Sequence, residues 1–202
     1  MRIRTITLFA TALAASLLLA GCSTAADDTT GGADHSSHST STPDASTSSE
    51  ANAADEMFAA MMIPHHEQAV EMADMILDKD GIDPRVTDLA QQIKDAQAPE
   101  IETMTGWLDD WGATSGDGMA GHDMGEDGMM DDEAMTALDD ATGDEAARLF
   151  LEGMIVHHEG AIDMAETELA DGQNPDALDL AQQVIDSQSA EITAMNDILD
   201  TL

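Results

Sequence analysis

The sequence predicts an all-α protein, an up-down-up-down four-helix bundle built from two tandem helical hairpins. The main observation is an internal repeat. Met-Ile-x-His-His-Glu occurs at residues 62–67 and 154–159, and Asp-Leu-Ala-Gln-Gln occurs at residues 88–92 and 179–183. Apolar residues recur around these stretches at three- and four-residue steps, the spacing of a helix with one buried face. Such a repeat indicates two copies of one supersecondary unit that pack against each other.

Each copy has the pattern of a helix, a short turn and a second helix. Gly81 and Gly172 mark the ends of the first helices, while Asp-Pro at 83–84 and Asn-Pro at 174–175 supply an N-cap and a first-turn proline for the second helices. Because the turns are short, the two helices of each copy must be antiparallel neighbours.

Polar residues interrupt the apolar stripes at matching places. His65 and His157 lie on the stripes of the first helices, and each second helix carries a glutamine and a glutamate on its stripe. The rise per residue is equal along both arms of a hairpin, so these residues should meet at one height. The sequence therefore predicts one interior layer of His65, His157, Gln97, Gln188, Glu100 and Glu191, with Met62, Met104, Met154 and Met195 about one helical turn away.

His66 and His158 follow these inward histidines directly. Adjacent residues of a helix point about 100° apart, so neither can share the inward direction fully. We expect both side chains at the helix–helix seams or on the surface.

The chain before the bundle has the features of an export signal. Residues 1–21 contain a basic start and an apolar run, and they lead to Leu-Ala-Gly-Cys ending at Cys22. Cys22 is the only cysteine, so we interpret it as the lipid-bearing first residue of the mature protein. Residues 22–51 are a Ser/Thr/Asp-rich spacer with too few large apolar side chains to fold. The bundle then occupies residues 52–202, outside the cytoplasm.

Within the bundle, the first copy covers residues 55–111 and the second covers residues 142–202. The linker at 112–130 is rich in methionine and contains Met119, His122 and Met124. Thioethers with an imidazole suit Cu(I), which makes the linker a candidate capture arm, although an acidic low-complexity linker with chance methionines explains it equally well. A short helix over 131–140 and a capping box at 142–145 should precede the third long helix.

Composition limits the classes of partner. The chain has 42 acidic and 6 basic residues, a net charge of −36. Such a surface repels nucleic acid and attracts cations, so we expect no nucleic-acid partner. No glycine-rich phosphate loop and no Ser/His/Asp arrangement stands out, and a single lipidated cysteine excludes thiol chemistry.

The paired His-His-Glu segments and the downstream Gln-x-x-Glu-Ile-x-x-Met resemble the bacterial family known as domain of unknown function 305. The resemblance covers residues 55–202. It implies a ferritin-like bundle that is exported or lipid-anchored, and it implies copper binding or copper tolerance, which has been attributed to some members. The positions that match the family motif are Met62, His65, His66, Met72, Met154, His157, His158 and Met164.

We therefore expect a lipid-anchored protein that binds copper, most simply Cu(I), and buffers it or passes it to a copper-handling partner. His65 and His157 are the expected imidazole ligands. Glu100 and Glu191 would orient them or bind the metal themselves. Soft ligands could come from the motif methionines and from Met104 and Met195.

Two alternatives stay open. One is a metal-free network of His, Gln and Glu that fixes the pairing of the hairpins, with the methionines as ordinary core residues. The other is a copper or iron redox enzyme. The di-iron pattern Glu-x-x-His is missing at the motif, where Met62 and Met154 stand three residues before the histidines. We therefore expect a binding protein rather than an enzyme.

Overall fold

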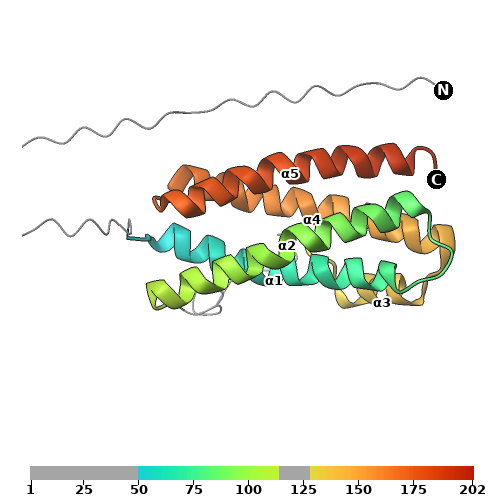
Figure 1. The fold of residues 1–202 in the computed structure, drawn as a ribbon, viewed down its shortest axis with the longest axis horizontal. Coiled ribbons are helices and arrows are strands. Elements are labelled where there is room, and N and C mark those ends of the chain that lie inside the picture. Colours follow the sequence, from blue (N-terminus) through green and yellow to red (C-terminus); the bar gives the residue numbers. More distant parts are fainter. Residues whose placement is uncertain (1–49, 114–127) are drawn as a thin grey trace, which may run out of the picture. The chain divides into compact units, whose positions relative to one another are not determined.

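The computed structural model describes residues 50–113 and 128–202, and this part of the chain is all-helical, as the sequence predicts. Four long helices form the bundle and one short helix packs beside it (Figure 1). The helices are α1 (Ala53–Leu77), α2 (Pro84–Trp111), α3 (Asp132–Asp140), α4 (Gly143–Asp171) and α5 (Pro175–Leu199).

The helix ends show why these elements begin and stop where they do. Asn52 caps α1 in a capping box with Asp55, and the residues before Pro84 and Pro175 cap α2 and α5 as predicted. Gly112 ends α2 with a φ of 73°, a left-handed conformation that glycine adopts without steric cost. Thr142 occupies the N-cap of α4, but its side chain makes no capping hydrogen bond, so the predicted capping box is wrong.

The order of helix directions differs from the prediction. Asp55, near the start of α1, accepts hydrogen bonds from the backbone N–H groups of Gln173 (3.0 Å) and Asn174 (2.8 Å) in the turn between α4 and α5. Arg85, at the start of α2, donates to Thr201 beyond the end of α5 (2.7 Å). The two turns therefore lie at opposite ends of the bundle and α1 runs antiparallel to α4 (Figure 1).

The directions are thus up, down, down, up, and the predicted up-down-up-down order is wrong. The cause is the connection between the hairpins, which is long enough to return along the bundle. Its described part lies against α1. The side-chain amide of Gln68 donates to the backbone carbonyl of Met130 and accepts from its backbone N–H, both at 2.8 Å. Lys79 donates to the carbonyl of Asp139 (2.6 Å). Ferritin-like bundles also have one long crossover connection, so the expected likeness to ferritin-like bundles holds.

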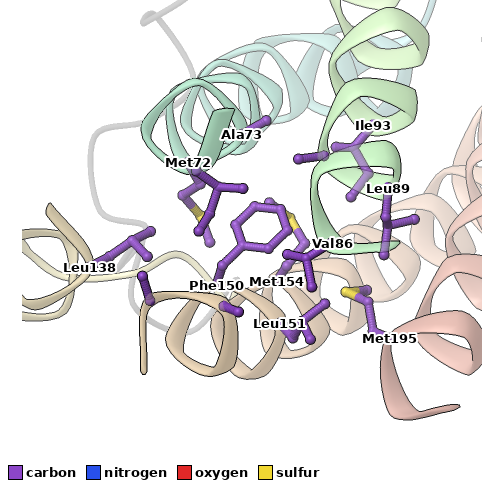
Figure 2. Close-up of a cluster of buried hydrophobic side chains, with 14 of the residues drawn as sticks. Met72, Ala73, Val86, Leu89, Ile93, Leu138, Phe150, Leu151, Met154 and Met195 are labelled. Atoms are coloured by element: carbon purple, nitrogen blue, oxygen red, sulfur yellow. The ribbon is translucent and has the colours of Figure 1, made fainter. Parts of the chain in front are cut away.

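The apolar core falls into two clusters, one toward each end of the bundle. Figure 2 shows the cluster toward the turn between α1 and α2, where Phe150 is surrounded by side chains from α1, α2, α4 and α5, and where Leu138 enters from α3. The other cluster contains Phe58, Met62 and Met104. The polar layer described below lies near the middle of the helices.

None of the helices that the structure describes is long and apolar enough to cross a membrane. The predictions for the signal peptide, Cys22, most of the spacer, and Met119, His122 and Met124 concern residues outside the described ranges.

Candidate metal centre

His65 and His157 meet at the centre of the bundle. They are the middle residues of α1 and α4, so two antiparallel helices that cross at their midpoints bring them together. Their ring centroids are 3.7 Å apart with planes tilted by 37°, and neither side chain is more than 1% exposed. The predicted meeting of the two inward histidines is confirmed.

His66 and His158 are fully buried as well, so of the two places predicted for them the helix–helix seam is confirmed and the surface is excluded. Each lies at the seam inside its own hairpin. Nε2 of His66 is 2.8 Å from Oε2 of Glu100, and Nε2 of His158 is 2.7 Å from Oε2 of Glu191. The glutamates therefore pair with the second histidine of each motif, so their predicted place opposite the first histidine is wrong.

These bonds determine which ring nitrogen carries the lone pair. An ionised carboxylate only accepts hydrogen bonds, so Nε2 of each histidine donates. In a neutral ring the lone pair is then on Nδ1. Nδ1 of His66 and of His158 is buried without a hydrogen-bond partner. A histidine that donates one nitrogen to a carboxylate and keeps the other free is the usual arrangement of a metal-binding imidazole.

Further buried polar atoms without hydrogen-bond partners surround the four histidines. Gln97 and Gln188 are each 3% exposed. Neither Nε2 nor Oε1 of Gln97 has a hydrogen-bond partner, and Oε1 of Gln188 has none. Buried polar atoms normally find partners, so this concentration in one layer is unusual for a purely structural core.

The electrostatics of the layer favour the neutral form of His157. Burial lowers the pKa of His157 well below the usual value, and the neighbouring histidines His65, His158 and His66 lower it further. A neutral ring retains the lone pair that a metal ion needs.

The methionines divide between the layer and its surroundings. Met62, Met104, Met154 and Met195 are completely buried, as expected for residues one turn from the histidines. Met72 is completely buried too and shares the apolar cluster around Phe150 with Met154 and Met195, while Met164 lines a pocket. Met72 and Met164 are about two helical turns from His65 and His157 along their helices, whereas Met62 and Met154 are about one turn away.

One buried polar pair away from the histidine layer is not predicted by the sequence. Asp55 and Glu168 lie at most 1% exposed between the start of α1 and the end of α4. Burial and the neighbouring Asp55 carboxylate raise the pKa of Glu168 to about 8. No motif surrounds either residue, so nothing in the sequence distinguishes them from the many exposed acids.

Within residues 50–113 and 128–202, no group of three or more His, Cys, Asp or Glu side chains already has an arrangement that could hold a metal ion. The paired rings of His65 and His157 pack against each other. An ion bound between them would therefore require the rings to rotate apart.

Over the described residues, the fold and the buried histidine layer define a helical-bundle protein with a polar centre in an apolar core. The chain belongs to the DUF305 family, domain of unknown function 305, whose model matches residues 55–199. No curated protein matches it.

Several solved structures are similar to the chain. A DUF305 fragment from Deinococcus radiodurans is 30% identical with a TM-score of 0.69, over 75% of this chain and 99% of that one. A presumed secreted DUF305 protein from Streptomyces coelicolor is 35% identical with a TM-score of 0.68, over 73% and 92%. CopM in its Cu(I)-bound form is 32% identical with a TM-score of 0.59, over 72% and 95%. CopM has also been solved with Cu(II) and with silver bound.

Proposed function

We propose that this protein binds copper at the histidine layer in the centre of its bundle, outside the cytoplasm, and buffers the ion or transfers it. The observation that carries the proposal is the pair of His–Glu hydrogen bonds. They leave Nδ1 of His66 and His158 buried and unbonded beside the paired rings of His65 and His157. Similarity to CopM, which has been solved with copper in both oxidation states, supports the choice of metal.

The donor set fits copper. Neutral imidazoles suit either oxidation state, and completely buried thioethers at Met62 and Met154 add soft ligands that favour Cu(I). Glu100 and Glu191 would act through the histidines by fixing the tautomer and the direction of each ring. Their side chains are 23% and 19% exposed, which leaves them beside the layer rather than inside it.

A metal-free network is the alternative, and the unpaired atoms argue against it. A network that holds two hairpins together should satisfy its members, because a buried polar group without a partner costs about 1–3 kcal/mol. Here Gln97 and Gln188 both have buried atoms without hydrogen-bond partners. The proposal is of binding and transfer, and it includes no catalytic step.

The proposal includes an extracytoplasmic location and a lipid anchor at Cys22. The leader and Leu-Ala-Gly-Cys at 19–22 support both, and the description of the Streptomyces relative supports export. A tethered protein with a net charge of −36 would concentrate cations near the membrane and pass copper to a partner there.

A competition titration tests the proposal. The purified protein is titrated with Cu(I) under anaerobic conditions against a chromophoric chelator of known affinity, with Cu(II), Zn(II) and Fe(II) in parallel. We expect stoichiometric Cu(I) binding at the histidine layer. The variant with His65→Ala and His157→Ala should lose this binding. A matched control with His35→Ala and His38→Ala removes the same number of histidines outside the bundle and should keep that binding.

Deletion of residues 119–124 separates the layer from the linker. We expect this deletion to change only the number of ions bound or the rate of uptake. Equal losses from the deletion and from the double histidine variant would contradict a site in the bundle core.

A further inference from the structure

A separate pocket lies between α1 and α4, at the end of the bundle near the turn between α4 and α5. Its volume is about 270 Å³. Three methionines line it, two from α1 and one from α4: Met57, Met61 and Met164. Met57 and Met61 are four residues apart and therefore share one face of α1, opposite Met164.

Because of the internal repeat, this pocket can be compared with the equivalent positions at the other end of α1 and α4. His65 corresponds to His157, so residues of α1 and α4 correspond at an offset of 92. The counterparts of the pocket residues therefore lie at the other end of the same two helices. There α3 covers them: Leu138 is completely buried against the cluster that contains Met72 and Phe150. Figure 2 shows Leu138 reaching this cluster from α3.

Met130 completes the cover at that end. A Cβ atom added to Gly153 would lie 2.7 Å from the sulfur of Met130, so this sulfur occupies the space next to Gly153. Gly153 is the counterpart of Met61. One end of the pseudosymmetric bundle is thus filled by the connection between the hairpins, while the equivalent place at the other end is an open pocket.

The residues at equivalent positions differ in their chemistry. The covered end has Leu149, Gly153 and Ile76 where the pocket has Met57, Met61 and Glu168. The difference in sulfur is therefore on one helix: α1 presents two thioethers, Met57 and Met61, where α4 has a leucine and a glycine. On the facing helices Met164 corresponds to Met72, which is completely buried in the covered cluster, whereas Met164 lines the open pocket. Asp163 and Thr167 add exposed oxygens at the rim of the pocket.

We propose that this pocket is a second binding site for a soft monovalent metal ion, with the thioether sulfurs of Met57, Met61 and Met164 as its ligands. Thioethers select Cu(I) and the chemically similar Ag(I) over hard cations. The acidic rim favours approach of a cation. The site is distinct from the histidine layer and depends on the proposed function only for copper as the natural ion.

The site should differ from the histidine layer in its response to acid. Thioethers carry no proton to lose or gain near neutral pH, whereas imidazoles must be neutral to bind metal. An ion held by the three methionines should therefore stay bound at an acidity that empties the histidine layer.

The test is an anaerobic Cu(I) titration of the purified protein and of the variant with Met57→Leu, Met61→Leu and Met164→Leu. Methionine and leucine have similar volumes, so the bundle should keep its fold, which circular dichroism and the urea midpoint check. We expect the triple variant to lose one equivalent of Cu(I) at pH 7 and at pH 5. The sulfur contribution to the copper X-ray absorption spectrum should decrease in parallel.

Two further variants make the result specific. Met75→Leu with Met135→Leu changes methionines at the covered end and should keep full stoichiometry. The variant with His65→Ala and His157→Ala should keep the equivalent that the triple variant loses, so failure of the histidine site would leave this proposal standing. Unchanged stoichiometry and absorption in the triple variant would overturn the proposal, as would an equal loss in the methionine control.

Discussion

The two hairpins agree closely at the midplane and differ at their ends. In α1–α2 the His66–Glu100 bond is 2.8 Å long, and in α4–α5 the His158–Glu191 bond is 2.7 Å long. Away from the middle the copies diverge. Asp55 and Glu168 form a buried acidic pair at one end, where the other end has Ala147 and Ile76.

The difference shows how one repeat can serve two purposes. The midplane keeps the histidines and glutamates in both copies, because the pseudosymmetry of the bundle brings both sets to one place. At the ends each copy meets different neighbours: α3 covers one end, and at the other Asn52 and Asp55 bond the residues around the turn between α4 and α5 beside the open pocket. Because the neighbours differ there, the two copies need different side chains at their ends, and their sequences differ there.

The largest expected effect concerns the two equivalent phenylalanines. Phe150 is completely buried under α3, whereas Phe58 is 4% exposed and lines the open pocket. Truncation of a fully packed phenylalanine typically costs about 3–5 kcal/mol. We expect Phe150→Ala to lower the free energy of unfolding by about that amount and Phe58→Ala by less, because the pocket already leaves part of its ring without neighbours.

Urea denaturation at fixed pH measures both values. Phe150→Leu and Phe58→Leu are the matched controls. They retain part of the side chain, so both losses of unfolding free energy should be smaller, with the larger loss still at Phe150. Equal losses for the two alanine variants would mean that α3 adds little to the packing around Phe150.

The acidic pair predicts a pH dependence that the other end lacks. The folded state holds the proton of Glu168 up to a pKa of about 8, while the unfolded chain releases it near 4.5. Between these values the folded state binds more protons, so this contribution to stability is complete below about pH 4.5 and declines as the pH rises toward 8. Glu168→Gln removes the titration.

The measurement is the free energy of unfolding of both proteins across pH 4.5–8. We expect the variant to gain stability relative to the parent as the pH rises. Glu166→Gln is the matched control, because it removes the same charge from an exposed neighbour on α4. If the Glu168 and Glu166 variants had the same pH profile, Glu168 would not hold its proton in the folded state.

Much of the fold follows from the sequence because the signals are local. The caps at Asp83 and Asn174, with the prolines after them, set the starts of α2 and α5 where predicted. The direction of the second hairpin could not be predicted in this way. It depends on the path of the connection, and residues such as Gln68, which bonds Met130, show no repeat or motif that reveals this contact.

The meeting of His65 and His157 was predictable even though the direction of the second hairpin was not. His65 and His157 are each at the middle of a helix, so they meet whether α1 and α4 run parallel or antiparallel. The burial of His66 and His158 was not predictable from the 100° step alone. Each points into the seam with its partner helix, where Glu100 or Glu191 supplies a hydrogen bond that makes burial favourable.

The smallest expected effect separates two helix starts that look alike in sequence. The side chain of Asn52 accepts hydrogen bonds from the N–H groups of Ala54 (2.7 Å) and Asp55 (3.0 Å), and its amide donates to the carbonyl of Asp171 (2.8 Å). Thr142 makes no capping bond. We expect Asn52→Ala to cost about 1–2 kcal/mol and Thr142→Ala less than about 0.5 kcal/mol in urea denaturation.

Serine substitutions sharpen this comparison, because serine is a strong N-cap residue at either position. Asn52→Ser should recover part of the loss by restoring an acceptor to the first turn of α1, while Thr142→Ser should change little. A loss at Thr142 as large as that at Asn52 would show that α4 depends on its first turn as α1 does. A small loss there would show that α4 is fixed mainly by the packing of Phe150, about two turns into the helix, in the cluster that also contains Leu138 of α3.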